Sequence, residues 1–190
     1  MDEMVERIRR YLDAQEETRE RVLDASRRVI RNSARAMAAL HRKDRETVER
    51  TLEEAREGIK ILAGVVEEEP RLEDYGPVLS AYREFAEVMI VRMLIEGQEL
   101  SDPEKLEVPY KPYLTALGDA MGELRRHVLD LIRADKIVEA ERMLGRMEDI
   151  FALLMEFDYP GSILPEMRHK RDVARRVLEQ TRGDITTATR

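Results

Sequence analysis

The hydrophobic and polar positions of this 190-residue chain follow a helical period along most of its length. Residues 2–42 contain neither glycine nor proline, and their apolar residues recur at three- and four-residue spacing, which predicts one or two helices. Asp44 is placed to cap the next amphipathic helix, and Pro70 is placed to end it near Glu69. The first third of the chain is therefore expected to be two to three long helices joined by short connections.

The remaining sequence predicts four more helices. Residues 73–100 are apolar on most sides, which is typical of a buried helix. A polar connection with three prolines, 101–112, precedes a helix that runs to about Ala134, and Asp135 is placed to cap a fifth helix. A break at 158–165 leads into a last helix over 166–181. We predict an all-α fold of six or seven helices in one domain spanning 1–190, with 183–190 as a flexible tail.

Composition narrows the classes of protein that the chain can belong to. The absence of cysteine excludes disulfides, thiolate metal sites and a cysteine nucleophile. The longest nearly apolar run, Phe85 to Ile95, is too short to cross a bilayer, and the charged N-terminus is unlike a signal peptide. A net charge of −7 excludes a basic footprint over the whole molecule, although local basic faces remain open. We expect a soluble, cytoplasmic protein that does not associate with a membrane.

The helix that begins near Tyr113 carries the first candidate for chemistry. Asp119 and Glu123 are four residues apart, so both carboxylates project from the same side of a helix. Gly118 and Gly122 flank them, and a glycine inside a helix costs about 1 kcal/mol relative to alanine. We expect these glycines to admit either the helix of residues 73–100 or a metal-bound phosphate close to the acids.

A second acid pair lies in the buried helix of residues 73–100. Glu84 and Glu87 are three residues apart and share one face. An ionised carboxylate in an apolar environment is costly unless it is paired or bound to a metal. The competing interpretation is an ion pair with Arg83, Arg92 or an arginine from another helix.

Four acids converge if these two helices face one another. Oxygen ligands without His or Cys favour Mg²⁺ or Mn²⁺ over zinc, and such a cluster suits phosphodiester hydrolysis. The sequence has no glycine-rich phosphate loop, no His-x-x-x-His zinc pair and no nucleophile elbow. A di-iron bundle would need Glu-x-x-His pairs, but Glu84 is followed three residues later by Glu87 and Glu123 by Arg126, which disfavours that alternative. From the residues alone, a metal nuclease and structural ion pairs both remain open.

A basic ridge on the first helix is the candidate for binding phosphate. Arg27, Arg31 and Arg35 repeat every four residues and therefore share a face. Arginine suits bidentate contacts with phosphate, while the alternative is an ordinary solvated face.

The sequence resembles the translin superfamily, and within it translin-associated factor X, in four segments that occur in the same order. The matching pieces are Ser26-Arg27, Ser33, Arg35 and Leu40-His41-Arg42; Arg83-Glu84-Phe85-Ala86-Glu87; Tyr113-Leu114 with Asp119-Ala120-Met121-Gly122-Glu123-Leu124; and Arg182-Gly183-Asp184-Ile185. The chain differs from eukaryotic members in its short 101–112 connection and in lacking an obvious nuclear-targeting segment, as a prokaryotic or archaeal version would.

This resemblance implies a translin-like helical fold, assembly into closed octamers and binding of single-stranded RNA or DNA. It further implies that the chain is a Mg²⁺-dependent endoribonuclease whose catalytic and metal-binding acids are Glu84, Glu87, Asp119 and Glu123. Arg27, Arg31, Arg35 and Arg83 are the expected nucleic-acid-binding residues. The oligomer is expected to be a homo-oligomer or a hetero-oligomer with a translin-like subunit. The alternatives are a non-catalytic nucleic-acid-binding oligomer of the same fold and a structural helical assembly with buried Glu–Arg pairs.

Overall fold

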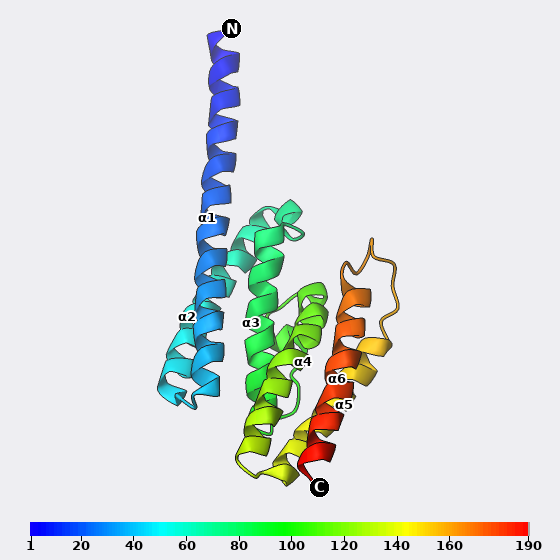
Figure 1. The fold of residues 1–190 in the computed structure, drawn as a ribbon. Helices are drawn as coiled ribbons and strands as arrows, with labels where there is room; N and C mark the ends of the chain where they lie inside the picture. Colours follow the sequence, from blue (N-terminus) through cyan, green and yellow to red (C-terminus); the bar gives the residue numbers. More distant parts are fainter. Residues whose placement is uncertain (190) are drawn as a thin grey trace. The chain divides into compact units, whose positions relative to one another are not determined.

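The computed structural model describes residues 1–189, which form α-helices, two short 3₁₀ helices and connections, without a strand (Figure 1). The elements are α1 (Asp2–His41), α2 (Arg45–Glu68), η1 (Pro70–Leu72), α3 (Gly76–Ile95), η2 (Pro103–Leu106), α4 (Tyr110–Arg133), α5 (Ile137–Met155) and α6 (Met167–Ala188). The predicted all-α class is therefore confirmed, and the described residues form six of the six or seven helices expected. Within the described residues, no helix is long and apolar enough to cross a membrane.

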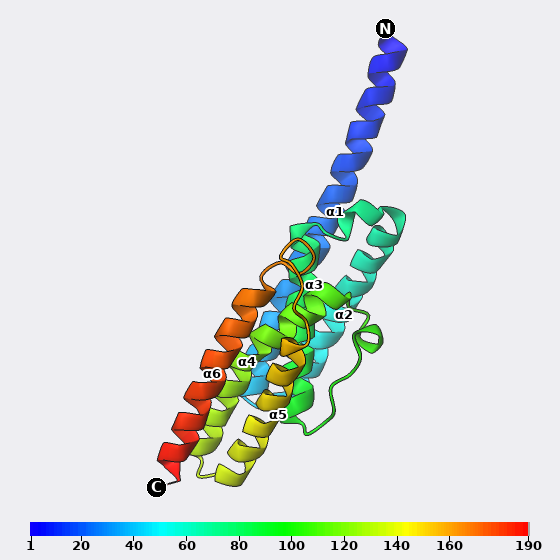
Figure 2. The ribbon, with the colours of Figure 1, turned by 90° about the vertical axis from the view of Figure 1, so that its right-hand side faces the viewer.

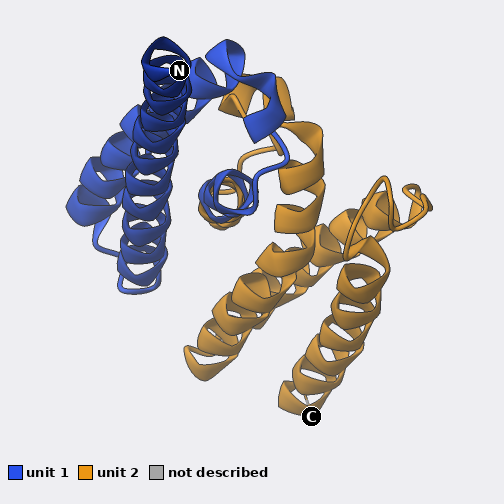
Figure 3. Ribbon diagram, turned by 90° about the horizontal axis from the view of Figure 1, so that it is seen from above, with its two compact units in different colours: residues 1–85 blue, residues 86–190 orange. Residues whose placement is uncertain are grey.

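The chain divides into two compact units, Met1–Phe85 and Ala86–Arg190 (Figure 3). The boundary falls inside α3, so Glu84 belongs to the first unit and Glu87 to the second. The apolar residues of α3 are largely buried, as the sequence predicts, whereas Glu84 and Glu87 are half-buried. A single domain over the whole chain stays a prediction.

The first unit is built on the α1–α2 hairpin. Asp44 caps α2 as predicted, since its Oδ1 accepts a hydrogen bond from the backbone N–H of Thr47 at 3.1 Å. The two helices pack closely because small residues line their contact. A Cβ added to Gly58 would lie 2.5 Å from Cγ2 of Val29, too close for any side chain. Ser26 and Ser33, which interrupt the apolar stripe of α1, are buried in the same unit.

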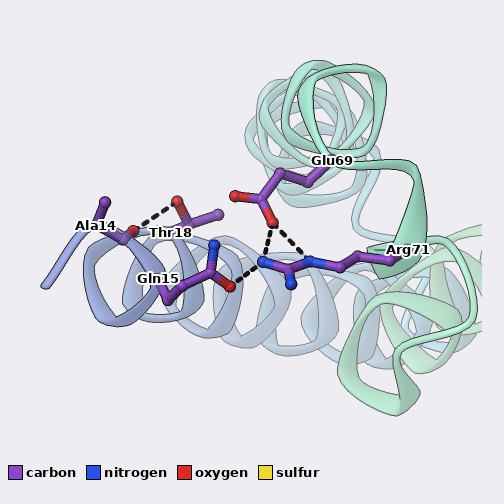
Figure 4. Close-up of polar contacts among 5 residues, drawn as sticks. All are labelled: Ala14, Gln15, Thr18, Glu69 and Arg71. Atoms are coloured by element: carbon purple, nitrogen blue, oxygen red, sulfur yellow. Dashed lines mark hydrogen bonds and ion pairs between the residues drawn. The ribbon is translucent and has the colours of Figure 1, made fainter. Parts of the chain in front are cut away.

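The N-terminal part of α1 projects beyond α2, because α1 has 40 residues and α2 has 24 (Figures 1 and 2). Where α2 ends, the guanidinium of Arg71 hydrogen-bonds to Glu69 and to the side-chain oxygen of Gln15 (Figure 4). Earlier in α1 the apolar side chains are exposed: Met4, Val5, Ile8, Tyr11 and Leu12. Among the described residues, nothing buries this apolar stripe of α1.

In the second unit, α4, α5 and α6 pack against one another. Their buried residues follow the predicted stripes: Leu117, Met121, Leu124 and Val128 on α4, Met147, Ile150 and Leu154 on α5, and Leu178 on α6. This three-helix core fixes the face of α4 that is left for Asp119 and Glu123.

Two predicted helix ends are wrong. Asp135 does not cap α5, because it adopts a left-handed conformation (φ 58°) in the turn after α4, and Lys136 stands at the cap position. The last helix does not end near Thr181 but continues through the expected tail to Ala188. Buried Ile185 and an ion pair of 2.6 Å between Arg125 and Asp184 hold this extension against the second unit.

Candidate functional site

Asp119 is held by a lysine from another helix. The Nζ of Lys170 on α6 lies 2.5 Å from Oδ1 of Asp119 on α4, and this is a charge-assisted hydrogen bond. The Lys170 side chain is 15% exposed and that of Asp119 is 27% exposed. Sequence reasoning missed Lys170, because the two residues are 51 positions apart and no spacing rule links them.

The two glycines beside these acids have different surroundings. Gly118 is buried, and a Cβ placed on it would lie 2.9 Å from Cβ of Lys170. Gly122 is exposed, and a Cβ there would meet nothing within 4 Å. The expectation that Gly118 admits the helix of Glu84 and Glu87 is therefore wrong, because the close neighbour is α6. Its smallness lets the Lys170 stem cross α4 on the way to Asp119.

The other three predicted acids, Glu84, Glu87 and Glu123, are half-buried. Glu123 is 3.9 Å from Arg126 one turn later on α4, and its side chain is 30% exposed. On α3, Glu84 is 4.0 Å from the neighbouring Arg83. Both of these contacts are long and therefore weak, and Glu87 and Glu123 each make a further polar contact.

Arg92, another predicted partner of the α3 acids, forms an ion pair of 3.1 Å with Glu96. Arg92 therefore has a carboxylate of its own one turn later on the same helix. The interpretation of the α3 acids as members of ion pairs is supported by the contact of Arg83 with Glu84.

The donor chemistry of the four acids fits a hard divalent cation. Carboxylate oxygens are the preferred ligands of Mg²⁺ and Mn²⁺. Asp119 shows directly that its carboxylate binds a cationic group, since the Lys170 ammonium is in contact with it. Among residues 1–189, however, no group of three or more His, Cys, Asp or Glu side chains is placed to hold a metal ion. The four residues are of the type that binds Mg²⁺ or Mn²⁺, and the four-acid metal site stays a prediction.

The predicted basic ridge forms an exposed face on α1. Arg27, Arg31 and Arg35 are all exposed, and within the described chain none of the three forms an ion pair. Arg83 differs from them, since it is half-buried and contacts Glu84.

A broader sequence signal surrounds this ridge. Residues 25–43 carry six Arg or Lys residues and no Asp or Glu, in a chain with 40 acids. This stretch of α1 is therefore a local basic segment in an acidic chain, and it attracts anions more than the net charge of −7 suggests. This acid-free stretch could have identified the full extent of the basic face, beyond the three arginines at four-residue spacing.

The chain is similar to one curated protein and to several solved structures. An uncharacterized protein of Methanocaldococcus jannaschii, MJ0175, is 32% identical over 179 residues, which cover 93% of this chain and 79% of the relative. AfC3PO, solved alone and in complex with duplex RNA, is 31% and 30% identical respectively. In both structures it covers 98% of this chain and 96% or more of its own, with a TM-score of 0.88.

A further solved structure, apo-NeC3PO, has the same TM-score of 0.88 over 97% of this chain and 96% of its own. At 18% identity it shows the fold alone. No family model matches the chain.

Proposed function

This chain belongs to the translin superfamily, as a translin-associated factor X-like member of the archaeal type, and on that premise we propose that it is an RNA-binding, Mg²⁺-dependent endoribonuclease. The observation that carries the RNA-binding part is its 30% identity, over 98% of the chain, to AfC3PO, whose structure was solved with duplex RNA. The catalytic part is supported by the family resemblance and by the two same-face carboxylate pairs.

In this proposal Glu84, Glu87, Asp119 and Glu123 would hold the cation. Mg²⁺, or Mn²⁺ in its place, would supply positive charge for the phosphate oxygens and lower the pKa of a bound water. The chain's own residues perform the remaining work. Asp119 would exchange its Lys170 partner for the metal, and Glu123 would bring a second carboxylate from one turn later on α4. The open space beside Gly122 leaves the substrate room to approach the α4 acids.

RNA would be held along α1 by Arg27, Arg31 and Arg35, with Arg83 as a further contact. These exposed α1 arginines have no carboxylate partner within the described chain, so their charge is free for phosphates. Contacts of this kind are independent of sequence and weaken as salt is raised. We propose single-stranded RNA as the substrate, and duplex RNA is tested beside it because AfC3PO was solved with a duplex.

An oligomer is the proposed working form, with a closed octamer as its expected size. The exposed apolar residues near the start of α1 support this step, since an uncovered apolar stripe on a helix of this length favours association. Assembly with a translin-like second subunit is an outcome to be tested by copurification from the native source.

A second function is favoured by a specific observation, namely that Lys170 already neutralises Asp119. An acid with a permanent internal partner would belong to a non-catalytic RNA-binding oligomer. This alternative requires binding that is independent of metal and that never leads to cleavage.

Incubation of the full chain with labelled single-stranded and duplex RNA, in Mg²⁺ or in EDTA, separates the two functions. Endonucleolytic products in Mg²⁺ and their loss in EDTA support the nuclease. Equal binding in both buffers with no products supports the binding protein, and failure to bind either RNA at low salt contradicts both.

A further inference from the structure

A pocket of about 340 Å³ lies where the C-terminal end of α1 meets the first turns of α2. Most of the side chains that line it are basic, hydroxyl-bearing or small: Arg35, Ala38, Arg42, Thr47, Arg50 and Thr51. Glu54 also lines it. The volume is roughly ten times the ~30 Å³ that one water occupies in the liquid, so the pocket has room for a hydrated oxyanion.

The three arginines of this pocket are only partly balanced by nearby carboxylates: Glu54 lines the pocket, and the charges of Arg42 and Arg50 act on Asp44. Arg35, Arg42 and Arg50 are exposed, and none of them forms an ion pair within residues 1–189. Glu54 forms no ion pair with any of them, so one carboxylate faces three guanidinium groups in the pocket. Three guanidinium groups around one hollow repel one another, and an anion placed among them relieves that repulsion.

The hydroxyl groups of the pocket are already used within the protein. Oγ1 of Thr51 donates to the carbonyl oxygen of Thr47 at 2.6 Å, and Thr47 hydrogen-bonds to Asp44, the cap of α2, through both its side chain and its backbone N–H. The donors that remain for a ligand are the guanidinium groups. They bind phosphate oxygens in a bidentate manner, and the positive end of the α2 dipole lies at the same end of the hairpin.

We propose that this pocket is a phosphate-binding site, formed by Arg35, Arg42 and Arg50, that seats a phosphate group of the RNA held along α1. The inference rests on the proposed function for the identity of its ligand. The pocket continues the basic face of α1, because Arg35 belongs to both. Residues 25–43, which hold Arg35 and Arg42, contain no Asp or Glu. Arg50 extends the face onto a second helix, which fixes where along α1 one phosphate lies.

The test compares RNA binding by Arg42→Gln and Arg50→Gln with binding by Arg45→Gln, measured in EDTA as a function of salt. Arg45 is exposed and lacks an ion pair within the described chain, but it does not line the pocket, so it is the matched control. Each pocket variant is expected to bind roughly three- to tenfold more weakly at moderate salt. Each should also reduce the slope of log K against log salt by about 0.7 to 0.9, the value for one lost phosphate contact. Arg50→Gln behaving like Arg45→Gln would overturn the site.

Two further arms identify the source of the phosphate. If the pocket variants lose affinity equally for 5′-hydroxyl and 5′-phosphorylated RNA, the pocket binds a backbone phosphate. If they lose affinity only for 5′-phosphorylated RNA, the pocket binds the phosphate at the end of the strand. Calorimetric titration with inorganic phosphate gives a further readout. Binding of phosphate by the wild-type chain that disappears in Arg50→Gln supports the pocket, even if the wild-type chain binds no RNA. Absence of any dependence on Arg50, in RNA and phosphate titrations alike, refutes the pocket while leaving metal-dependent cleavage untouched.

Discussion

The Lys170 ammonium lies 2.5 Å from Oδ1 of Asp119, and the stem of the same lysine passes directly over Gly118. One side chain thus explains two features of α4 that the sequence leaves unrelated, a buried glycine and a neutralised acid. It also means that, without metal, the proposed site is balanced by a cation from the protein itself.

Replacing Lys170 with Met keeps the stem over Gly118 and removes the ammonium. Because the pair is largely shielded from solvent, we expect the free energy of unfolding in EDTA to fall by about 1–2 kcal/mol, between the values for exposed and buried pairs. Urea denaturation measures this loss. In a double-mutant cycle, adding Asp119→Asn to Lys170→Met should restore most of the lost unfolding free energy. An unchanged stability of Lys170→Met would contradict the importance of the pair.

The same variant makes a prediction about metal. If Asp119 exchanges Lys170 for Mg²⁺, its carboxylate no longer has to release the ammonium in Lys170→Met and should bind the ion more tightly. Mg²⁺ should then raise the melting temperature of Lys170→Met more than that of the wild type. Equal shifts in both proteins would argue against metal at Asp119.

Alanine at the two α4 glycines should have opposite effects on stability. Gly122→Ala meets nothing within 4 Å and gains helix propensity, so it should stabilise the chain by up to about 1 kcal/mol. Gly118→Ala forces a contact of 2.9 Å with Cβ of Lys170 and should destabilise it. Thermal unfolding of both variants tests this contrast. Slower RNA cleavage by the more stable Gly122→Ala is expected if the substrate uses the space beside Gly122.

The α2 cap makes stability depend on pH. Hydrogen bonds from Thr47, with a smaller contribution from the charges of Arg42 and Arg50, hold the pKa of Asp44 below its ordinary value of 3.8. Because the folded-state pKa is lowered, the cap contributes its full stabilisation above about pH 3.8. This stabilisation is lost as the pH falls through the folded-state pKa. Asp44→Asn keeps a capping oxygen without a titrating group. The difference in unfolding free energy between the two proteins should therefore change only in this acidic window, and a constant difference would contradict it.

The α1 ridge predicts salt-dependent binding of RNA. Arg31→Gln should weaken binding at low salt and reduce the salt slope by about 0.7 to 0.9. Arg56→Gln is the control, because Arg56 lies on α2 and is paired with Glu53 at 3.5 Å. Filter binding over a range of salt concentrations measures both. Equal losses in the two variants would show that the effect is general charge and not the ridge.

Local rules predicted most of the helices, because apolar spacing, the Asp44 cap and Pro70 act within a few residues of one another. The errors occurred where tertiary contacts decide. Asp135 resembles a cap in sequence, but the turn after α4 places it in a left-handed conformation. Gly183 resembles the start of a tail, but Ile185 and Asp184 tie the segment to the second unit and prolong α6.

The candidate site was predictable only as separate pieces. Helical spacing placed Asp119 with Glu123 and Glu84 with Glu87, since each pair lies on one helix. Lys170 could not be found in this way, because its approach depends on how α6 packs against Gly118. The phosphate pocket likewise joins residues from two helices, although the acid-free stretch over 25–43 could have pointed to it.

The most direct test of the central claim is the rate of Mg²⁺-dependent RNA cleavage by Glu123→Gln, which keeps the shape of the side chain and removes its charge. Glu139→Gln is the matched control, because Glu139 on α5 is also paired with a basic residue three positions away, Lys136, at 3.6 Å. We predict that Glu123→Gln loses cleavage by about a hundredfold while still binding RNA in EDTA, and that Glu139→Gln cleaves like the wild type. Undiminished Mg²⁺-dependent cleavage by Glu123→Gln would contradict the carboxylate metal site.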